Sequence, residues 1–382
     1  MSHVQARVQR FIDDEVETGR EIGLQVAAYH RGALIADAWS GVADVRSGRR
    51  VDPETLFVVF SVSKGVTATV IHLLAERSRL DYDAPIADYW PAFAQHGKAA
   101  ITVRQALTHT AGLPHLPRDL RPEELIDWDR MCAVIEASSP LWEPGTKTGY
   151  HALTFGWILG ELARRVDGRP ISRIVAEDLC APLGIDSLYF GMPEAAVPRL
   201  AHLEFAPEPT PDPMTPAPDP MTPAPDDYAA MTVPPAVLPL GAWANRPEFP
   251  RAVVPAAGGV ANARSLARLF AGLVGDGVDG RRLLPPERVA VASTLQTDAI
   301  DVVVGAAWPK GLGYFLGSPT AIQTCVSPTA FGHTGAGGFT AYADPPLELA
   351  FALCKTQMST GTDADADTAR RFERELHAAL GV

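Results

Sequence analysis

The sequence predicts an α/β (α+β) fold in two lobes, with one antiparallel sheet flanked by terminal helices and a mainly helical lobe inserted into it. Pairs of apolar runs typical of strands lie near both ends of the chain, each pair beside an amphipathic helix, whereas the long middle carries helical spacing. Both ends can share one sheet only if the middle forms a separate lobe, so we expect a cleft between the lobes. A single unit of residues 1–382 is expected, with one lobe of about 1–80 and 255–382 and a second of about 81–254.

The two ends of the chain supply the predicted sheet and its flanking helices. Apolar residues near both ends, such as Val8 and Ile12 or Phe372 and Leu376, recur at the three- or four-residue spacing of an amphipathic helix. The members of each strand pair are separated by three or four residues that include Gly or Pro, which is typical of a hairpin. The predicted elements are a helix over 4–17, strands over 24–29 and 34–39, strands over 339–343 and 347–354, and a closing helix over 369–380.

The middle of the chain carries helices and one proline-rich segment. Residues 207–226 contain 9 prolines in 20 residues, and the heptapeptide DPMTPAP occurs twice in succession within them. Because proline removes a backbone donor and restricts φ, we expect this segment to be an extended, polyproline-like surface loop. Helices are expected over 152–165, 172–179 and 263–274.

Composition and charge exclude several classes of partner. The 382 residues include 33 Lys+Arg and 45 Asp+Glu, so the formal net charge is −12, and 47% of the residues are hydrophobic. Nucleic acids and anionic membranes are polyanions that an acidic chain repels, so we expect neither as a partner. The first residues lack the apolar run of a secretory signal. The sequence also contains no run of ~18 apolar residues, the length needed to cross a membrane. We therefore expect a cytoplasmic protein.

Several common catalytic motifs are absent from the sequence. It contains no GxSxG around a serine, no GxxxxGK[ST] phosphate loop, no HExxH zinc helix and no GxGxxG after a strand. The four cysteines are widely separated and match neither a redox pair nor a zinc site. We therefore expect no metal and no organic cofactor.

An SxxK motif is the first candidate for catalysis. An apolar run over 57–60 leads into a predicted helix at Ser61, and Lys64 follows three positions later. Residues three apart lie on one face of a helix, so the lysine can reach the serine hydroxyl. A serine needs a neighbouring base to become a nucleophile, and a desolvated lysine can serve as one. The N–H groups at the helix start would favour a developing oxyanion.

Further segments follow the SxxK motif in a set order. They are TVRQALTHTAGLP at 102–114, WEPG at 142–145 with Tyr150, PAAGGV at 255–260 and HTGAGGF at 333–339. In this order and spacing the chain resembles the serine β-lactamase and penicillin-binding-protein superfamily, in particular its class C-like branch with the family VIII carboxylesterases. The resemblance implies a β-lactamase-like fold with the active site between its two lobes.

The resemblance also implies roles for individual residues. Ser61 matches the acylated nucleophile, Lys64 its lysine partner, and Tyr150 the tyrosine that acts as a base and returns a proton to the leaving group. Either Lys64 or Tyr150 can take the first proton, so we treat them as a coupled pair. The backbone N–H groups of Ser61 and Ala336 match the oxyanion hole.

Five further residues are expected to bind substrate. His333, Thr334 and Gly335 match the KTG strand of the family. His151, beside the tyrosine, is a candidate for the pocket wall, and Trp308 is a candidate for an acyl pocket, although such aromatics also fill cores.

Two departures from the family pattern favour esters as substrates. The asparagine of the YxN motif is replaced by Ala152, and the lysine of KTG by His333. The expected function is a serine hydrolase that cleaves small-molecule carboxylic esters of small or medium acyl groups. The alternative is an acyltransferase that passes the same acyl group to an alcohol or amine.

Two further alternatives are less favoured. A D-peptidase or β-lactamase is disfavoured by Ala152 and by the lack of an export signal, and an inactive binding protein by the presence of the serine, lysine and tyrosine. The proline-rich segment is expected to be either a semi-rigid flap near the acyl pocket or a disordered surface insertion.

Overall fold

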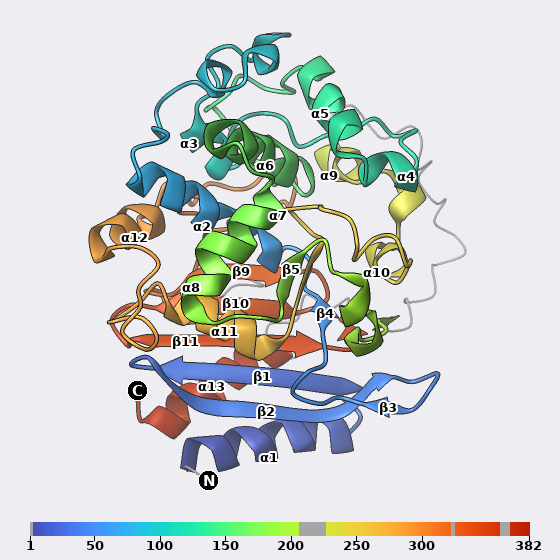
Figure 1. Cartoon of the computed structure of the whole chain (residues 1–382), viewed down its shortest axis with the longest axis vertical. Helices are drawn as coiled ribbons and strands as arrows, with labels where there is room; N and C mark the ends of the chain where they lie inside the picture. The colour runs from blue at the N-terminus through green and yellow to red at the C-terminus, as the bar shows by residue number, and fades with distance from the viewer. Residues whose placement is uncertain (1–2, 206–226, 322–324, 360–366) are drawn as a thin grey trace.

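The computed structural model describes residues 3–205, 227–321, 325–359 and 367–382. Among these residues seven strands form one antiparallel sheet, which lies in the lower half of Figure 1. In spatial order they are β3 (Arg49–Arg50), β2 (Ala33–Asp44), β1 (Gly23–His30), β11 (Leu349–Lys355), β10 (Phe339–Asp344), β9 (Phe331–Gly335) and β8 (Phe315–Leu316).

Strands from the two ends of the chain meet at the centre of this sheet. β1 pairs with β11 over seven residues, from Leu24 opposite Lys355 to His30 opposite Leu349. Both predicted hairpins are confirmed, since β1 pairs with β2 and β10 with β11. The predicted α/β fold with a shared antiparallel sheet is therefore confirmed.

Helices cover both faces of the sheet. The terminal helices α1 (His3–Glu17) and α13 (Thr368–Leu380) pack on one face, where Ile12 and Phe372 join a core with Val26 of β1. Helix α11 (Ala263–Ala271) covers the other face and contacts β1 and β11. Because side chains alternate along a strand, Val26 faces the terminal helices and Ala27 faces the main core. Strand β1 is therefore buried on both sides.

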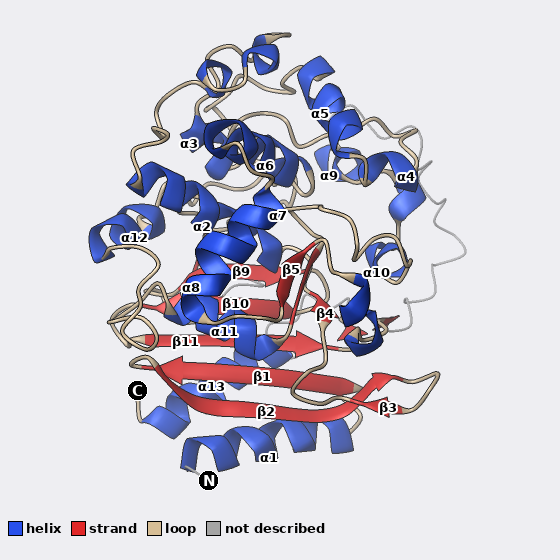
Figure 2. Ribbon diagram, in the orientation of Figure 1, coloured by secondary structure: helices blue, strands red, loops and turns tan. Residues whose placement is uncertain are grey.

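The remaining helices lie mostly above the sheet and surround α2 (Val62–Glu76), as Figure 2 shows. Two of the predicted middle helices are observed with shifted bounds. Helix α6 is Thr154–Asp167, and the segment predicted over 172–179 is divided between α7 (Ile171–Ile174) and η3 (Val175–Cys180). The other helices of this part are η1 (Ile86–Asp88), η2 (Pro91–Ala94), α3 (Val103–Leu107), α4 (Pro122–Leu125), α5 (Trp128–Ala137), α8 (Ala181–Leu183), η4 (Glu194–Arg199), α9 (Tyr228–Thr232), η5 (Pro235–Val237), α10 (Leu240–Ala244) and α12 (Pro286–Ser293).

Two small sheets link the helices to the main sheet. In one of them β4 (Phe57–Val58) pairs with β7 (Gly259–Ala261), which also pairs with β5 (Leu188–Phe190). In the other, β6 (Glu204–Phe205) pairs with β12 (Gln357–Met358). Strand β4 matters most for the site, because it leads directly into α2.

Two expectations concern other parts of the chain. The duplicated DPMTPAP segment lies outside the described residues, so its predicted loop stays a prediction. Within the described ranges, no helix is both long and apolar enough to cross a membrane.

Candidate active site

Ser61 lies where β4 turns into α2. The turn passes through Phe60, whose φ of 45° is in the left-handed region that bulky residues rarely adopt. Ser61 is the N-cap of α2, but its hydroxyl caps no backbone N–H and is therefore available to other partners. Helix α2 is buried from Val62 to Ala75, including its polar residues Lys64 and His72. The serine is therefore held at the end of a rigid core element.

Lys64 is fully buried and points at the serine. Its Nζ donates to Ser61 Oγ at 3.0 Å, to the carbonyl oxygen of Ala152 at 2.7 Å and to that of Ala256 at 2.9 Å. Burial holds the pKa of Lys64 well below its ordinary value, because an ammonium loses its hydration in this position. The predicted one-turn spacing therefore places an amine with a lowered pKa against the nucleophile.

Tyr150 faces the same two residues from the segment that precedes α6. Lys64 Nζ lies 4.7 Å from the centre of its ring. Burial raises the pKa of Tyr150 above its ordinary value, and a hydrogen bond with Ser61 acts in the opposite direction. Burial thus favours the neutral form of both groups, so that Lys64 is an amine able to accept a proton and Tyr150 a phenol able to donate one. The structure brings Ser61, Lys64 and Tyr150 together.

The end of β9 comes close to the serine turn because of a glycine. A Cβ on Gly335 would collide with the carbonyl oxygen of Val59, so only glycine permits this approach. Ala336 follows directly, before the turn into β10. In the part of the chain that the structure describes, the N–H groups of Ser61 and Ala336 donate to no other protein group. Both N–H groups are therefore available to an oxyanion.

A cavity of about 150 Å³ opens beside Ser61. Trp308, Thr334 and Gly335, three of the predicted substrate-binding residues, line it. No charged side chain is among the described residues that line it. Its lining consists of Phe60, Ser61, Tyr150, Ala152, Leu153, Val233, Leu240, Ala257, Trp308, Phe315, Thr334, Gly335 and Ala336.

The other two predicted substrate-binding residues lie behind the cavity wall. The ring of His333 is buried and stacks on Phe315 at 4.1 Å between centroids, and burial holds its pKa well below the ordinary value. His151 is also buried, with Nδ1 2.6 Å from the Gly149 carbonyl oxygen and Nε2 accepting from the N–H of Leu113 at 2.9 Å. Both rings are therefore neutral and lie behind the cavity wall, and neither forms part of the cavity surface.

Neutral histidines also hold the segment of residues 148–152, which we call the tyrosine loop. Nδ1 of His109 accepts from the N–H of His151 at 3.1 Å, and the His109 carbonyl oxygen accepts from the N–H of Gly149 at 2.9 Å. His109 adopts a φ of 60°, which turns its backbone toward the loop. In the sequence His109 lies within the segment over 102–114, and these contacts show that it supports the tyrosine loop.

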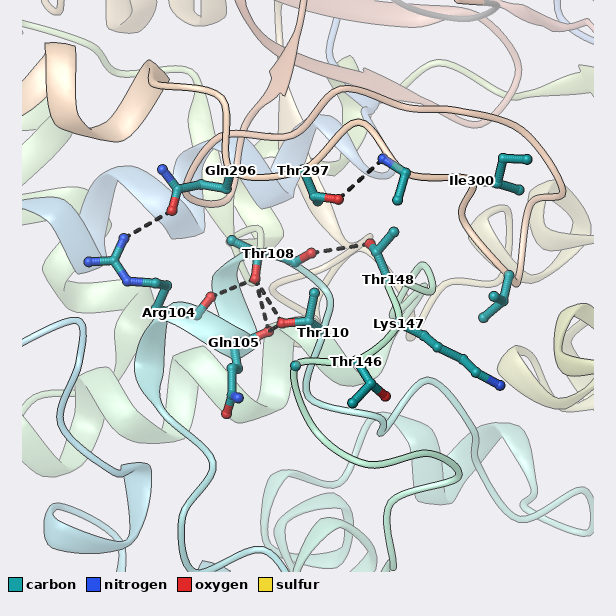
Figure 3. Close-up of a pocket in the computed structure, with 13 residues that line it drawn as sticks. Arg104, Gln105, Thr108, Thr110, Thr146, Lys147, Thr148, Gln296, Thr297 and Ile300 are labelled. Carbon is teal, nitrogen blue, oxygen red and sulfur yellow. Dashed lines mark hydrogen bonds between the residues drawn. The ribbon is translucent and has the colours of Figure 1, made fainter.

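A larger cavity of about 370 Å³ lies on another side of the tyrosine loop (Figure 3). Its hydroxyl groups are bonded within the protein, since Thr108 Oγ1 is 3.0 Å from Thr110 Oγ1 and Thr148 donates to the Thr108 carbonyl oxygen at 3.3 Å. None of the predicted catalytic residues lines this cavity among the described residues. The smaller cavity is therefore the candidate active site.

Comparison with known proteins agrees with this geometry. The sequence model of the family described as Beta-lactamase matches residues 8–376. The chain belongs to the beta-lactamase family. It is thus a hydrolase of the beta-lactamase type, and the resemblance seen in the sequence motifs is confirmed.

Proteins that are similar to this chain include esterases. "Esterase/beta-lactamase LipL" of Mycobacterium tuberculosis is 36% identical over 342 residues, which cover 88% of this chain and 77% of that protein. The crystal structure of a family VIII carboxylesterase matches with a TM-score of 0.88 and 31% identity, over 99% of this chain and 98% of that one. A penicillin-binding protein homolog from Caulobacter crescentus matches with a TM-score of 0.85 and 33% identity, over the same shares.

We predict that Tyr150→Phe slows acylation of Ser61 about 10²- to 10⁴-fold, the usual contribution of a general acid–base group. The phenyl ring keeps the edge contact with Trp308, so the fold should be retained. The reaction rate with a fluorophosphonate measures acylation, and the circular dichroism spectrum checks that the fold is retained. Tyr82→Phe is the control, because Tyr82 is buried and bonded to His72 outside the cavity. Equal rates for the two variants would contradict the role of Tyr150.

We also predict that acid destabilises the fold through its buried neutral histidines. Burial lowers the pKa of His151 to about 4 and that of His72 to about 3, against 6.5 for an ordinary histidine. Between about pH 6.5 and 4 the unfolded chain binds protons that the folded chain does not. The free energy of unfolding therefore keeps its full value above about pH 6.5 and decreases as the pH drops toward 4. The decrease is on the order of 3 kcal/mol for His151 alone.

Urea denaturation at pH 7, 6 and 5 measures this loss in a range above most carboxylate titrations. The variant His151→Gln should show a weaker dependence on pH, because one titrating ring is gone. A free energy of unfolding that stays constant between pH 7 and 5 would contradict the prediction.

Proposed function

We propose that the protein is a carboxylesterase that hydrolyses esters of small acyl groups through an acyl-Ser61 intermediate. The observation that carries this proposal is the contact of 3.0 Å between the buried Lys64 amine and Ser61 Oγ at the edge of an apolar cavity. A buried amine with a lowered pKa can accept the hydroxyl proton, directly or with Tyr150.

The proposed reaction has two halves. Ser61 Oγ attacks the ester carbonyl carbon, its proton passes to the Lys64–Tyr150 pair, and the negative oxygen is bound by the N–H groups of Ser61 and Ala336. The pair then returns the proton to the leaving alcohol as the carbon–oxygen bond breaks. A water molecule attacks the acyl-enzyme in the same manner and releases the acid.

The cavity supports small acyl groups. Its volume of about 150 Å³ is below the ~300–1,000 Å³ of most sites for drug-sized ligands. Leu153, Val233, Leu240, Trp308 and Phe315 give it an apolar surface that favours a short alkyl chain.

The same site supports esters over β-lactams or peptides that carry a carboxylate. No cation is among the described residues that line the cavity, and His333, where the family has a lysine, is buried and neutral. Ala152 offers no side-chain amide to position a peptide bond. Similarity to a family VIII carboxylesterase and to a protein named esterase/beta-lactamase also supports the proposal.

An acyltransferase is the second candidate, favoured by the apolar lining. An alcohol of low polarity enters such a cavity more readily than water does, so it could compete for the acyl-enzyme. Incubation with a p-nitrophenyl ester and added 1-butanol distinguishes the two. Formation of the butyl ester at the expense of the free acid would indicate transfer.

We predict that Ser61→Ala abolishes esterase activity, with kcat at least 10³-fold lower, because no other nucleophile replaces the hydroxyl. Assays with p-nitrophenyl esters of increasing acyl length, with nitrocefin in parallel, measure the loss. The wild type should also gain the mass of one fluorophosphonate adduct at Ser61. Normal ester turnover by the variant, or nitrocefin as the best substrate, would contradict the proposal.

We predict that Leu240→Ala shifts the preference toward longer acyl chains. Leu240 and Val233 line the cavity from the segment that follows the proline-rich stretch of the sequence. Removing this side chain makes room for additional methylene groups, each worth roughly 10- to 200-fold in kcat/KM in a fitted pocket. Leu238→Ala is the matched control, because Leu238 is exposed and lies two positions away, outside the lining. The same acyl profile in both variants would contradict the assignment of Leu240.

A further inference from the structure

We propose that Asp301 and Lys310, a buried ion pair on the segment between α12 and β8, position Tyr150 for proton transfer and set the electrostatic field at its phenol. This inference rests on the proposed acyl-Ser61 chemistry. Both residues lie far from Tyr150 in the sequence, and neither belongs to the motifs that carry the family resemblance.

The carboxylate of Asp301 is the direct anchor of Tyr150. Its side chain is 0% exposed, and Oδ1 accepts from the backbone N–H of Tyr150 at 3.0 Å. The same oxygen accepts from the N–H groups of Val303 and Val304 at 2.9 and 3.0 Å. Oδ2 accepts from Lys310 Nζ at 2.9 Å, and the lysine side chain is 1% exposed. One carboxylate thus joins the tyrosine to the turn over 301–304.

Lys310 supplies a second anchor on the same loop. Its Nζ donates to Thr148 Oγ1 at 3.1 Å, and the N–H of Val302 donates to the Thr148 carbonyl oxygen at 2.9 Å. Thr148 in turn donates to the Thr108 carbonyl oxygen, a bond drawn in Figure 3. Residues 148 and 150 are therefore both attached to the segment that carries the ion pair, one on each side of Gly149.

The segment with the ion pair also builds the wall of the cavity. Trp308 lies between Asp301 and Lys310 in the sequence, lines the cavity, and meets the Tyr150 ring edge-on with the centroids 5.5 Å apart. The catalytic ring and the acyl wall are thus held by one segment. A shift of about 1 Å in a reacting group can cost about 10²-fold in rate, so this attachment bears directly on catalysis.

Stability alone gives little reason for such a pair. Replacing a buried ion pair by apolar residues of similar volume is often neutral or stabilising, because two charges lose their hydration. The buried N–H groups of Tyr150, Val303 and Val304 instead all donate to the same oxygen, Oδ1 of Asp301, and a carboxylate is a strong acceptor for them. The pair provides this acceptor while keeping the local net charge at zero.

The charges around Tyr150 indicate what the pair does to its phenol. Lys64 faces the ring from α2, while neutral His109 and His333 lie 5.1 and 6.2 Å from it between centroids. The negative charge of Asp301 raises the pKa of Tyr150. Because Lys310 Nζ lies 2.9 Å from Asp301 Oδ2, we expect its positive charge to offset part of that effect. Removal of the Asp301 charge should therefore shift the pH dependence of acylation in one direction, and removal of the Lys310 charge should shift it in the opposite direction.

Asp301→Asn and Lys310→Met test the inference. Active enzyme is titrated with a fluorophosphonate, and the pH–rate profile of p-nitrophenyl acetate hydrolysis is measured per active site. We expect kcat to fall at least tenfold in both variants, with KM within about threefold. The rising limb of the profile should move to lower pH in Asp301→Asn and to higher pH in Lys310→Met, and the double variant should lie between them.

Glu161→Gln is the matched control for loss of a buried carboxylate. Glu161 is 0% exposed on α6, where it pairs with Arg164 and Arg165 away from the cavity. The Glu161→Gln variant should have a lower melting temperature, whereas its kcat and its pH–rate profile per active site should be unchanged. Thr148→Val, which keeps the ion pair, is the milder probe and should lower kcat several-fold even if the other variants do not fold.

The outcomes separate the inference from the proposed function. Unchanged kcat and pH profile per active site in Asp301→Asn and Lys310→Met would overturn the inference, as would unchanged kcat in Thr148→Val if those two do not fold. A wild type that fluorophosphonate does not label at Ser61 would instead refute the proposed function.

Discussion

The structure of the site depends on one buried amine held against one hydroxyl. An ammonium taken out of water loses several kcal/mol of hydration free energy, and only well-placed acceptors offset this loss. Lys64 finds its acceptors on three separate segments, at Ser61, Ala152 and Ala256. The start of α2, the tyrosine loop and the turn before β7 must therefore converge on one point, and the burial of α2 on all sides follows from this convergence.

The groups around that point are neutral or compensated. His109, His151 and His333 are buried rings whose pKa values lie below the ordinary histidine value. The buried charges of Asp301 and Lys310 cancel each other. In such surroundings the N–H groups of Ser61 and Ala336 are the donors placed to receive a developing negative charge. Electrostatic interactions are stronger where water is excluded, so a small apolar cavity can stabilise an oxyanion with few donors.

The sequence predicted the parts of the fold that have a clear period. Both terminal hairpins and both terminal helices could be predicted because their apolar residues alternate or recur over many positions. Strands β4 to β9 and β12 contain two to five residues each, too few to show a period. Of these, the sequence pointed only to β9, through a family motif, and to β4, as part of the apolar run over 57–60. The predicted helix over 263–274 ends at Ala271, where Gly272 follows as its C-cap.

The sequence could not show which way the side chains of the predicted substrate-binding residues point. Successive side chains of an extended segment point to opposite sides, so Thr334 reaches the cavity while His333 lies behind it. The same reason separates Tyr150 from His151, although the two are neighbours in the chain.

The sequence by itself determined the local chemistry, because one helical turn places Lys64 beside Ser61 in any fold that keeps this helix. Only the tertiary structure decided which distant groups complete the site. Asp301 lies 151 positions from Tyr150, and Leu240 reaches the cavity from beyond the proline-rich segment. Contacts of such separation arise from packing between segments, which leaves no periodic pattern in the sequence of either one.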